Sequence, residues 1–285
     1  GEFKPGVRVI DDENIEVANG ENIKNIRVFS TRDLNELNYA DYGADVVLEC
    51  TGKFLTTEKC EPYLARGIKK VVMSAPAKDD TPTFVIGVND DAYAGQAIIS
   101  NASCTTNGLA PVAKVLDEKF GIQKALMTTI HAYTHGQSLV DVKAKDFRRS
   151  RAAALNIGPT TTGAAKAIAK VLPELSGKLH GQAVRVPVAN VSMVDLTAVL
   201  KRPASKEEIN EAFRAAAESN LKGILFVDDD YRVSSDFCTS AYSSIVASDT
   251  TQVIADDMVK VFAWYDNEWG YSTRLVDLAK IVATK

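Results

Sequence analysis

The sequence has no long uninterrupted apolar segment, although 46% of its 285 residues are hydrophobic. A membrane-spanning helix needs about 20 consecutive apolar residues, so we expect no membrane segment. The sequence also has no excess of positive charge, because 33 Lys and Arg residues are set against 37 Asp and Glu residues. The net charge of −4 gives no electrostatic reason to expect a nucleic-acid or membrane-surface partner.

Cysteine is scarce, and the four cysteines at positions 50, 60, 104 and 238 do not have the spacing of metal ligands. In a chain of this length they are interpreted as free thiols, which predicts a cytoplasmic protein without a bound metal. The Gly-rich fingerprint G-x-G-x-x-G and the phosphate-binding P-loop are also absent. Because the sequence begins with Gly1 and not with Met, we expect that an N-terminal part is missing.

The first hundred residues alternate between strand-like and helix-like patterns. Short apolar runs separated by helices predict a parallel sheet covered on both faces. Ligands of such sheets bind beyond the carboxyl ends of the strands, where this chain has the small or polar residues Thr51, Gly52 and Ser74. The expected strands are 26–29, 44–50, 70–74, 83–87 and 97–100, and the expected helix is 57–65.

After residue 104 the pattern changes to consecutive strands, which imply an antiparallel or mixed sheet with helices to one side. The segment from Ser205 to Glu208 predicts a capping box at the start of a helix. Residues 134–151 are polar, rich in Lys and Arg, and predict an irregular loop. The expected strands are 126–131, two runs within 184–200, 224–227, 243–246 and 259–264, and the expected helices are 161–171 and one that begins near 272.

The most informative segment is residues 100–107, which read SNASCTTN. An apolar run ends before Cys104 and an amphipathic helical pattern begins there, with Ser103 as the expected N-cap. A thiol in the first helical turn meets free backbone N–H groups and the positive end of the helix dipole, which favour the nucleophilic thiolate. We therefore predict a lowered pKa for Cys104, with a buried, inert cysteine as the alternative.

A nucleophilic thiol needs a base, and His131, at the end of an expected strand, is the best candidate among three histidines. Arg185 interrupts an apolar strand, so it either pairs with a buried carboxylate or binds an anionic ligand. The residues from Thr160 to Gly163 open a helix with hydroxyls and free N–H groups, which suits phosphate binding or plain capping. Asn267, which lies among aromatic residues, either forms a turn or presents its amide to an amide ligand.

Taken together, these motifs resemble phosphorylating glyceraldehyde-3-phosphate dehydrogenase, and they follow the order and spacing of that family along the chain. The segment 100–107 is the most specific of them. The family usually has Asn-Asp after the position of Thr134, where this chain has His135 and Gly136. The other matching motifs are TIHAYT at 129–134, RSRAAA at 149–154, PTTTGAAK at 159–166, RVP at 185–187, VSMVDL at 191–196, SSDF at 234–237 and WYDNEWGY at 264–271.

The resemblance implies an oxidoreductase of glycolysis that converts glyceraldehyde 3-phosphate and inorganic phosphate to an acyl phosphate through a cysteine thioester. It implies NAD as the cofactor, with NADP not excluded, and a homotetramer. Cys104 would be the nucleophile and His131 its base. The remaining implied contacts are Thr134, Arg185 and Arg151 for the substrate phosphate, Ser103, Thr105, Thr162 and Gly163 for inorganic phosphate, and Thr51, Gly52, Ser74, Asn267 and Tyr271 for the cofactor.

The implied fold class is α/β plus α+β. A Rossmann-type dinucleotide-binding domain that lacks its first strands would comprise residues 1–103 and 267–285, and a catalytic domain with a mixed or antiparallel sheet would comprise residues 104–266. We expect such a chain to keep its reactive thiol without binding dinucleotide by itself. The alternatives are a dehydrogenase of the erythrose-4-phosphate type, a cysteine hydrolase built from Cys104 and His131, and an inactive fragment that acts as a binding or oligomerisation module.

Overall fold

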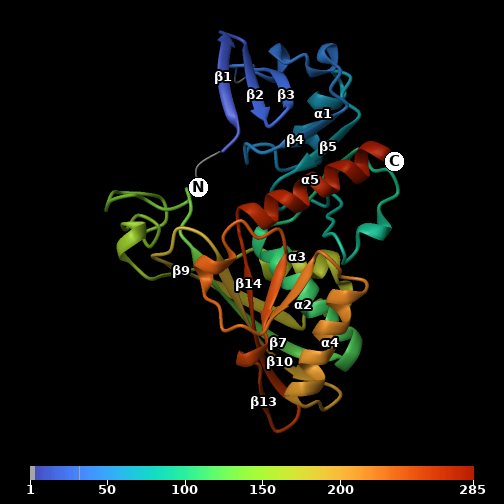
Figure 1. Ribbon diagram of the computed structural model, residues 1–285, viewed down its shortest axis with the longest axis vertical. Coiled ribbons are helices and arrows are strands. Elements are labelled where there is room, and N and C mark those ends of the chain that lie inside the picture. The colour runs from blue at the N-terminus through green and yellow to red at the C-terminus, as the bar shows by residue number, and fades with distance from the viewer. Residues whose placement is uncertain (1–3, 32) are drawn as a thin grey trace.

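The computed structural model describes residues 4–31 and 33–285, which contain three β-sheets (Figure 1). The N-terminal sheet is an antiparallel meander of β1 (Gly6–Asp11), β2 (Asn14–Asn19) and β3 (Asn22–Arg27). The sequence analysis placed a single strand at 26–29, which is wrong for this region. The missed signal is Gly20, the first of the two residues between β2 and β3, whose φ of +62° suits a tight hairpin turn.

The second sheet is parallel and has the order β4-β5-β6. Alternate residues of β5 point to opposite faces, so Val71 packs with Tyr63 of α1, whereas Val72 packs with Leu275 and Leu278 of α5. The sheet is therefore covered on both faces, as predicted. The bounds are Val46–Glu49 for β4, Lys70–Met73 for β5, Ile98–Ser100 for β6, Thr57–Leu64 for α1 and Trp269–Thr284 for α5.

The strand expected at 83–87 does not form; it is reduced to one isolated bridge between Thr83 and Ser100. The side chain of Asn89 explains the difference. Its Oδ1 accepts a hydrogen bond from Val85 N at 2.8 Å, and its Nδ2 donates to Thr83 O at 2.9 Å. An amide side chain thus satisfies the backbone groups that a neighbouring strand would otherwise pair.

The third sheet is mixed and has the order β11-β12-β14-β10-β7-β9-β8, with β13 paired to β14. The pairs β7–β9 and β11–β12 are parallel and the other pairs are antiparallel. A parallel sheet and a larger mixed sheet confirm the expected fold class. The strands are β7 (Ile122–Ala132), β8 (Gly158–Thr160), β9 (Leu179–Val186), β10 (Ser192–Leu200), β11 (Leu225–Asp228), β12 (Ser244–Ala247), β13 (Gln252–Ile254) and β14 (Met258–Tyr265).

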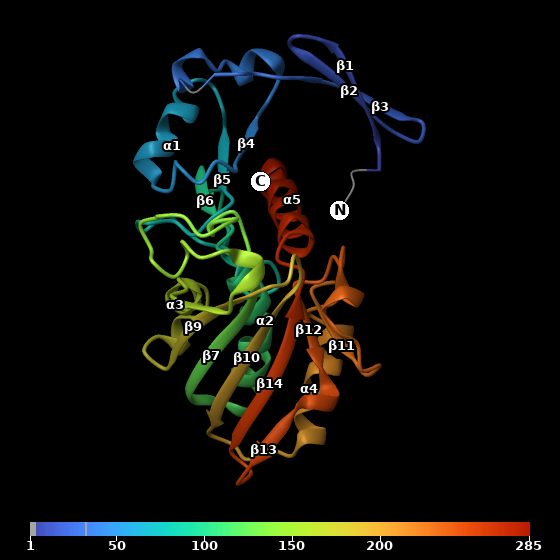
Figure 2. The same cartoon turned by 90° about the vertical axis from the view of Figure 1, so that its left-hand side faces the viewer.

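One face of the mixed sheet is covered by α2 (Cys104–Phe120), α3 (Ala164–Val171) and α4 (Lys206–Glu218), as Figure 2 shows. Residues of β10 alternate between buried and half-buried, and the buried set packs against Leu116, Ile168 and Phe213 of the three helices. The predicted capping box of α4 is confirmed. The expected helix start at 161 is wrong, because Thr160 belongs to β8 and α3 begins at Ala164.

The predicted loop at 134–151 is confirmed, since no helix or strand occupies it. Among the described residues, no helix combines the length and the apolar character needed to cross a membrane. Short 3-10 helices lie at Leu34–Glu36, Tyr39–Tyr42, Asp90–Ala92, Ala153–Leu155, Pro173–Leu175, Ser234–Phe237 and Ser248–Thr250.

Candidate active site

Cys104 is the first residue of α2, as the sequence predicts. Ser103 caps this helix, because its Oγ accepts a hydrogen bond from Thr106 N at 3.1 Å. The residue before the cap, Ala102, has a φ of +56°, a conformation that is strained for a residue with a side chain. The chain therefore turns sharply between β6 and α2, and this turn places the Cys104 thiol at the start of the helix.

His131 lies near the end of β7, and its Nε2 is 3.5 Å from Sγ of Cys104. The imidazole is buried, with 4% of its surface exposed. The ring of Tyr265 meets it edge-on at a centroid distance of 6.0 Å, and the Tyr265 hydroxyl contacts Thr105 and Thr129. The thiol and the imidazole, which are 27 residues apart in the chain, thus form a direct pair on rigid elements.

Burial dominates the protonation of this pair. It raises the pKa of the Cys104 thiol, although the hydroxyl and N–H of Thr105 and the charge of Arg185 act in the opposite direction. The predicted lowering of the Cys104 pKa is therefore wrong. Burial and the charge of Arg185 also lower the pKa of His131 to about 4, from an ordinary value of 6.5.

Arg185 lies opposite His131, because β9 and β7 pair in a register that aligns the two residues. Its Nη1 is 2.8 Å from His131 Nδ1 and donates to Ala132 O at 2.9 Å. Its buried Nε has no partner, and no ion pair joins Arg185 to a carboxylate among the residues that the structure describes. Of the two alternatives for Arg185, this geometry favours the anionic ligand.

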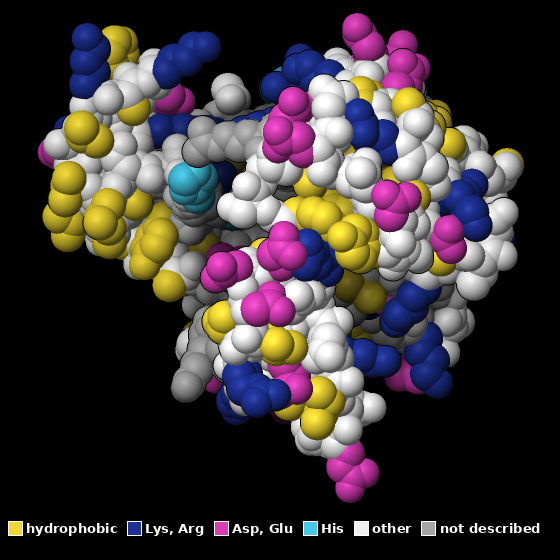
Figure 3. Space-filling view, turned by 90° about the horizontal axis from the view of Figure 1, so that it is seen from above, with side chains coloured by type: hydrophobic (Ala, Val, Ile, Leu, Met, Phe, Trp, Pro, Cys, Tyr) yellow, Lys and Arg dark blue, Asp and Glu magenta, His cyan; other side chains and the backbone are white. Residues whose placement is uncertain are grey.

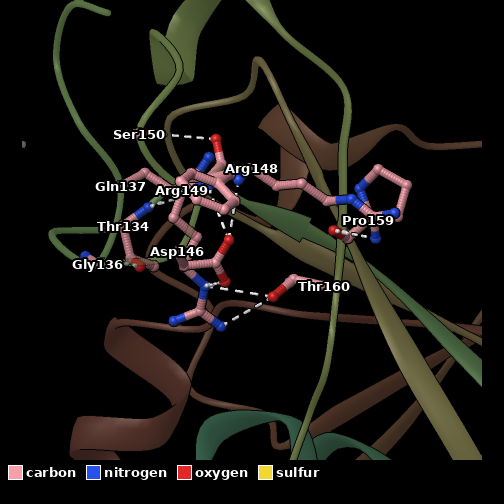
Figure 4. Close-up of polar contacts among 10 residues, drawn as sticks. Thr134, Gly136, Gln137, Asp146, Arg148, Arg149, Ser150, Pro159 and Thr160 are labelled. Atoms are coloured by element: carbon pink, nitrogen blue, oxygen red, sulfur yellow. Dashed lines mark hydrogen bonds and ion pairs between the residues drawn. The ribbon is translucent and has the colours of Figure 1, made fainter. Parts of the chain in front are cut away.

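A second arginine, Arg149, reaches towards the same site. Burial lowers the pKa of Arg185, and the positive charge of Arg149 lowers it further, so the two guanidinium groups repel one another. Arg149 donates to Thr160 Oγ1 from Nε and Nη2 at 3.2 and 3.1 Å (Figure 4). A Cβ atom built on Gly136 would lie 3.6 Å from Thr134 Oγ1 and 3.7 Å from Arg149 Nη1, so these two groups lie around Gly136.

The sequence analysis selected Arg151 and did not propose Arg149. The structure places Arg151 at the surface, where its Nε forms an ion pair with Asp141 Oδ2 at 3.1 Å. No hydrogen bond within the described part of the chain joins Arg151 to the cluster around Arg185. Both arginines belong to a run of Arg residues, and only the course of the loop decides which one faces inward.

The other proposed phosphate contacts lie at helix starts or near them. The Ser103 and Thr105 hydroxyls are hydrogen-bonded to Thr106 and Tyr265, respectively. Thr162 Oγ1 accepts from Ala164 N at 3.2 Å, and the neighbouring Gly163 is the N-cap residue of α3 without a side chain to cap it. The hydroxyls of Ser103 and Thr162 therefore already accept hydrogen bonds from backbone N–H groups at helix starts, and the hydroxyl of Thr105 already contacts Tyr265.

The three cofactor candidates Thr51, Gly52 and Ser74 follow β4 and β5 at the same edge of the parallel sheet, as predicted. Thr51 N donates to Glu49 Oε1 at 2.8 Å, and Gly52 has a φ of +69° with open space where a side chain would stand. The backbone can therefore approach a ligand closely at this edge.

Asn267 has its amide orientation fixed by Ser192, which the sequence analysis missed. Ser192 Oγ accepts from Ala132 N at 3.1 Å and donates to Asn267 Oδ1 at 2.7 Å. Nδ2 of Asn267 is thus the group left to donate to a ligand carbonyl. The preceding Asp266 accepts from the N–H groups of Glu268 and Trp269, so the turn alternative holds for Asp266.

Tyr271, on α5, donates to Ala102 O at 3.2 Å and so ties this helix to the turn before Cys104. Inside the same region, both polar side-chain atoms of Asn101 are buried without a partner. A ligand with its own donor and acceptor, such as a carboxamide, fits these unpaired groups and the free Nδ2 of Asn267.

Comparison with known proteins gives a consistent result. Residues 103–267 match the family described as glyceraldehyde 3-phosphate dehydrogenase, C-terminal domain. The chloroplastic glyceraldehyde-3-phosphate dehydrogenase B of Pisum sativum is 55% identical over 289 residues, which cover 100% of this chain and 63% of the relative. The glyceraldehyde-3-phosphate dehydrogenase of Mycobacterium avium is 60% identical over 86% of this chain and 73% of its own length. For glyceraldehyde-3-phosphate dehydrogenase 1 of Bacillus cereus the corresponding values are 52%, 96% and 82%. The chain thus spans less than two thirds of the pea relative.

Proposed function

Since this chain belongs to the glyceraldehyde-3-phosphate dehydrogenase family, we propose that it carries the catalytic thiol of a phosphorylating dehydrogenase that acts on glyceraldehyde 3-phosphate. The observation that carries the proposal is the contact of 3.5 Å between Cys104 Sγ, at the start of α2, and His131 Nε2. The relatives reported above are named for the triose substrate, so the erythrose-4-phosphate alternative is not favoured. A cysteine hydrolase would need no nicotinamide and no second anion site.

The proposed reaction begins when the Cys104 thiol gives up its proton to His131 Nε2 and its sulfur attacks the aldehyde carbon of the substrate. The imidazolium then returns this proton to the oxygen of the adduct, which becomes a hydroxyl, and His131 is neutral again. A bound nicotinamide cofactor, NAD or NADP, would supply the acceptor for the hydride that the adduct loses. His131 takes the hydroxyl proton of the adduct, which leaves a thioester on Cys104. Inorganic phosphate then attacks the thioester carbon, and Cys104 leaves as a thiolate and acyl phosphate is released.

The two phosphate groups of this reaction need separate anion sites. We assign the substrate phosphate to Thr134 and Arg185, and we add Arg149, because its charge acts on Arg185 and its Nη1 lies with Thr134 Oγ1 around Gly136. Both arginines pair with a carboxylate, Arg149 with Asp146 at 3.6 Å and Arg151 with Asp141 at 3.1 Å. Arg151 stays a weaker candidate because its side chain is 60% exposed, against 34% for Arg149. For inorganic phosphate we retain Ser103, Thr105, Thr162 and Gly163, which lie at the starts of α2 and α3.

The cofactor would lie at the edge formed by Thr51, Gly52 and Ser74 and extend towards Asn267 and Tyr271. This assignment is supported by the open space at Gly52 and by the fixed orientation of the Asn267 amide. We propose residues 1–103 and 267–285 as one domain, because α5 packs on the parallel sheet, and 104–266 as the catalytic domain. Four free thiols agree with a reducing compartment such as the cytoplasm.

We further propose that the protein forms a homotetramer through the segment that contains the loop 134–151. Large apolar side chains of this segment are exposed, including Leu139 at 86%, Phe147 at 85% and Leu155 at 81%. Figure 3 shows apolar side chains gathered along the outer edge on the side where Figure 1 places this loop. A second copy of the chain would cover them. A monomeric mass by light scattering at micromolar concentration would exclude this assembly.

The test of the proposed function uses two readouts on Cys104→Ser and on the exposed control Cys238→Ser. The first, measured on the full-length protein, is reduction of NAD or NADP with glyceraldehyde 3-phosphate and inorganic phosphate. The second needs no nicotinamide: acetyl phosphate should transfer its acetyl group to Cys104, and mass spectrometry locates the adduct. Cys104→Ser should lose both activities and Cys238→Ser should keep them. Acetylation at another residue, or activity without the Cys104 thiol, would contradict the proposal.

A further inference from the structure

Glu49, the last residue of β4, carries a buried carboxylate at the sheet edge that holds the proposed cofactor contacts. Only 2% of its surface is exposed. Its Oε1 accepts hydrogen bonds from Thr51 N at 2.8 Å and from the Thr51 hydroxyl, and its Oε2 accepts from the Tyr63 hydroxyl of α1 at 2.7 Å. Within residues 4–31 and 33–285, no ion pair joins this carboxylate to a lysine or an arginine. Neutral donors therefore hold it, and two of them belong to Thr51, which is exposed.

These hydrogen bonds fix the polarity of the Thr51 hydroxyl. A carboxylate only accepts, so the single hydroxyl proton of Thr51 is donated to Glu49. The hydroxyl oxygen also accepts from Lys53 N at 3.2 Å, which uses one of its two lone pairs. The second lone pair is left for a ligand. Thr51 Oγ1 can therefore accept a hydrogen bond from a ligand but cannot donate one.

Glu49 also takes up backbone donors that a phosphate group could otherwise use at this edge. Thr51 N donates to the side chain of Glu49, and Ser74 N donates to its carbonyl oxygen at 3.0 Å. Phosphate oxygens need donors and positive charge, whereas the charge beside Thr51 is negative. An uncharged donor, such as a hydroxyl or amino group of a nucleoside, would meet a free lone pair here without repulsion.

We propose that Glu49 is a positioning residue of the cofactor site: it makes Thr51 a hydrogen-bond acceptor, so that this strand end takes an uncharged donor group of the dinucleotide and not its pyrophosphate. This inference rests on the proposed function, in which Thr51 contacts the cofactor. Glu49 is buried and acts through Thr51. Tyr63 binds the other oxygen of the same carboxylate, so its hydrogen bond ties Glu49 to α1 and leaves Thr51 untouched.

The test compares three variants of the full-length protein. Glu49→Leu removes the acceptor for both donors of Thr51. Glu49→Gln removes the negative charge but keeps the acceptor, because its Oε1 can accept from Thr51 while its Nε2 donates to the Tyr63 hydroxyl. Tyr63→Phe is the matched control, since it breaks only the bond to Oε2. Titration calorimetry measures the binding of NAD and of NADP, and urea unfolding measures stability.

Glu49→Leu should weaken binding of the preferred dinucleotide about tenfold, whereas Glu49→Gln should stay within about twofold of the wild type. Tyr63→Phe should lose stability and keep its dinucleotide affinity. Unchanged affinity in Glu49→Leu would overturn the proposal. Weakened binding by Tyr63→Phe would overturn it too, because affinity would then follow stability alone. Much tighter binding by Glu49→Gln would place a phosphate group beside Thr51, and binding as weak as that of Glu49→Leu would show that the charge matters and not the acceptor; either result contradicts the proposal.

A double-mutant cycle separates positioning from packing. Thr51→Val removes the acceptor itself and should weaken dinucleotide binding about tenfold, as Glu49→Leu does. The double variant should lose no more affinity than either single variant, because both changes remove the same contact. Additive losses would show that Glu49 does not act through Thr51. If Glu49→Leu does not fold, the other two changes decide the question: Thr51→Val must weaken binding and Glu49→Gln must not.

The outcomes separate this inference from the proposed function. A protein that shows the expected binding pattern but does not oxidise glyceraldehyde 3-phosphate would refute the dehydrogenase assignment and retain the role of Glu49. An active dehydrogenase whose dinucleotide affinity does not respond to Glu49→Leu would do the reverse. A full-length wild type without affinity for either dinucleotide would refute both.

Discussion

Acidification should destabilise this protein through one buried side chain, His131. Burial and the charge of Arg185 lower the pKa of His131 to about 4 in the folded state, against 6.5 for an exposed histidine. The unfolded chain therefore binds more protons than the folded chain between these two pH values. Stability that is present above pH 6.5 must be lost as the pH falls towards 4.

The magnitude follows from the difference between the two pKa values, about 2.5 units at 1.36 kcal/mol for each unit, or roughly 3 kcal/mol. His131 is only 4% exposed, so solvent screening does not reduce this value much. A loss of this size is a large share of the ~5–15 kcal/mol that stabilises a typical domain. It should be visible in ordinary urea titrations.

The assay compares urea unfolding of the wild type and His131→Gln between pH 6.5 and 4 in chloride buffers, with tryptophan fluorescence as the probe. Trp264 on β14 reports on the mixed sheet that contains His131. Carboxylates that titrate in this range cancel between the two proteins. The stability advantage of the wild type should shrink by roughly 3 kcal/mol across the range.

The matched control is His180→Gln. His180 is exposed, and it lies on β9 of the same mixed sheet. This variant should keep the pH slope of the wild type. A stability difference between wild type and His131→Gln that does not change with pH would refute the reasoning. It would mean that the buried imidazole already carries its charge in the folded state.

Two stability predictions concern backbone and capping. Gly181→Ala should cost about 1–3 kcal/mol in urea unfolding, because its Cβ would lie 2.6 Å from the carbonyl oxygen of Met127, whereas Gly158→Ala in the adjacent strand meets nothing within 4 Å and should be nearly neutral. Ser205→Ala should lower stability by about 1 kcal/mol, because it removes the acceptor for Glu208 N at 3.2 Å, and Ser205→Thr should recover most of that loss.

Sequence patterns predicted the elements whose signal is local. The parallel strands, the start of α2 at Cys104 and the capping box of α4 follow from apolar runs, a small polar cap residue and a short motif. The strand expected at 83–87 does not form, for a reason that no periodic sequence pattern reveals. Its apolar run is that of a buried strand, but the side chain of Asn89 takes over its backbone hydrogen bonds.

The sequence could predict those site residues that lie at the end of a strand or at the start of a helix. Cys104 and His131 stand at such ends, so the sequence could bring them together, but it could not supply the balance between burial and dipole. The helix dipole and the Thr105 donors favour the thiolate, and burial outweighs them. The choice between Arg149 and Arg151 depends on the path of an irregular loop, for which no periodicity exists.

The side chains of the site are held in place in two different ways. Cys104 and His131 are held by a capped helix and by a strand in the interior of the mixed sheet, so their contact is set by the core. Arg149 is held by a loop whose hydrogen bonds are mostly to its own neighbours and to Thr160. Arg185 joins the two, because its backbone lies in β9, its guanidinium contacts the imidazole, and the charge of Arg149 acts on it. The candidate anion site and the reacting pair are therefore linked by this one side chain, whose Nη1 lies 2.8 Å from His131 Nδ1.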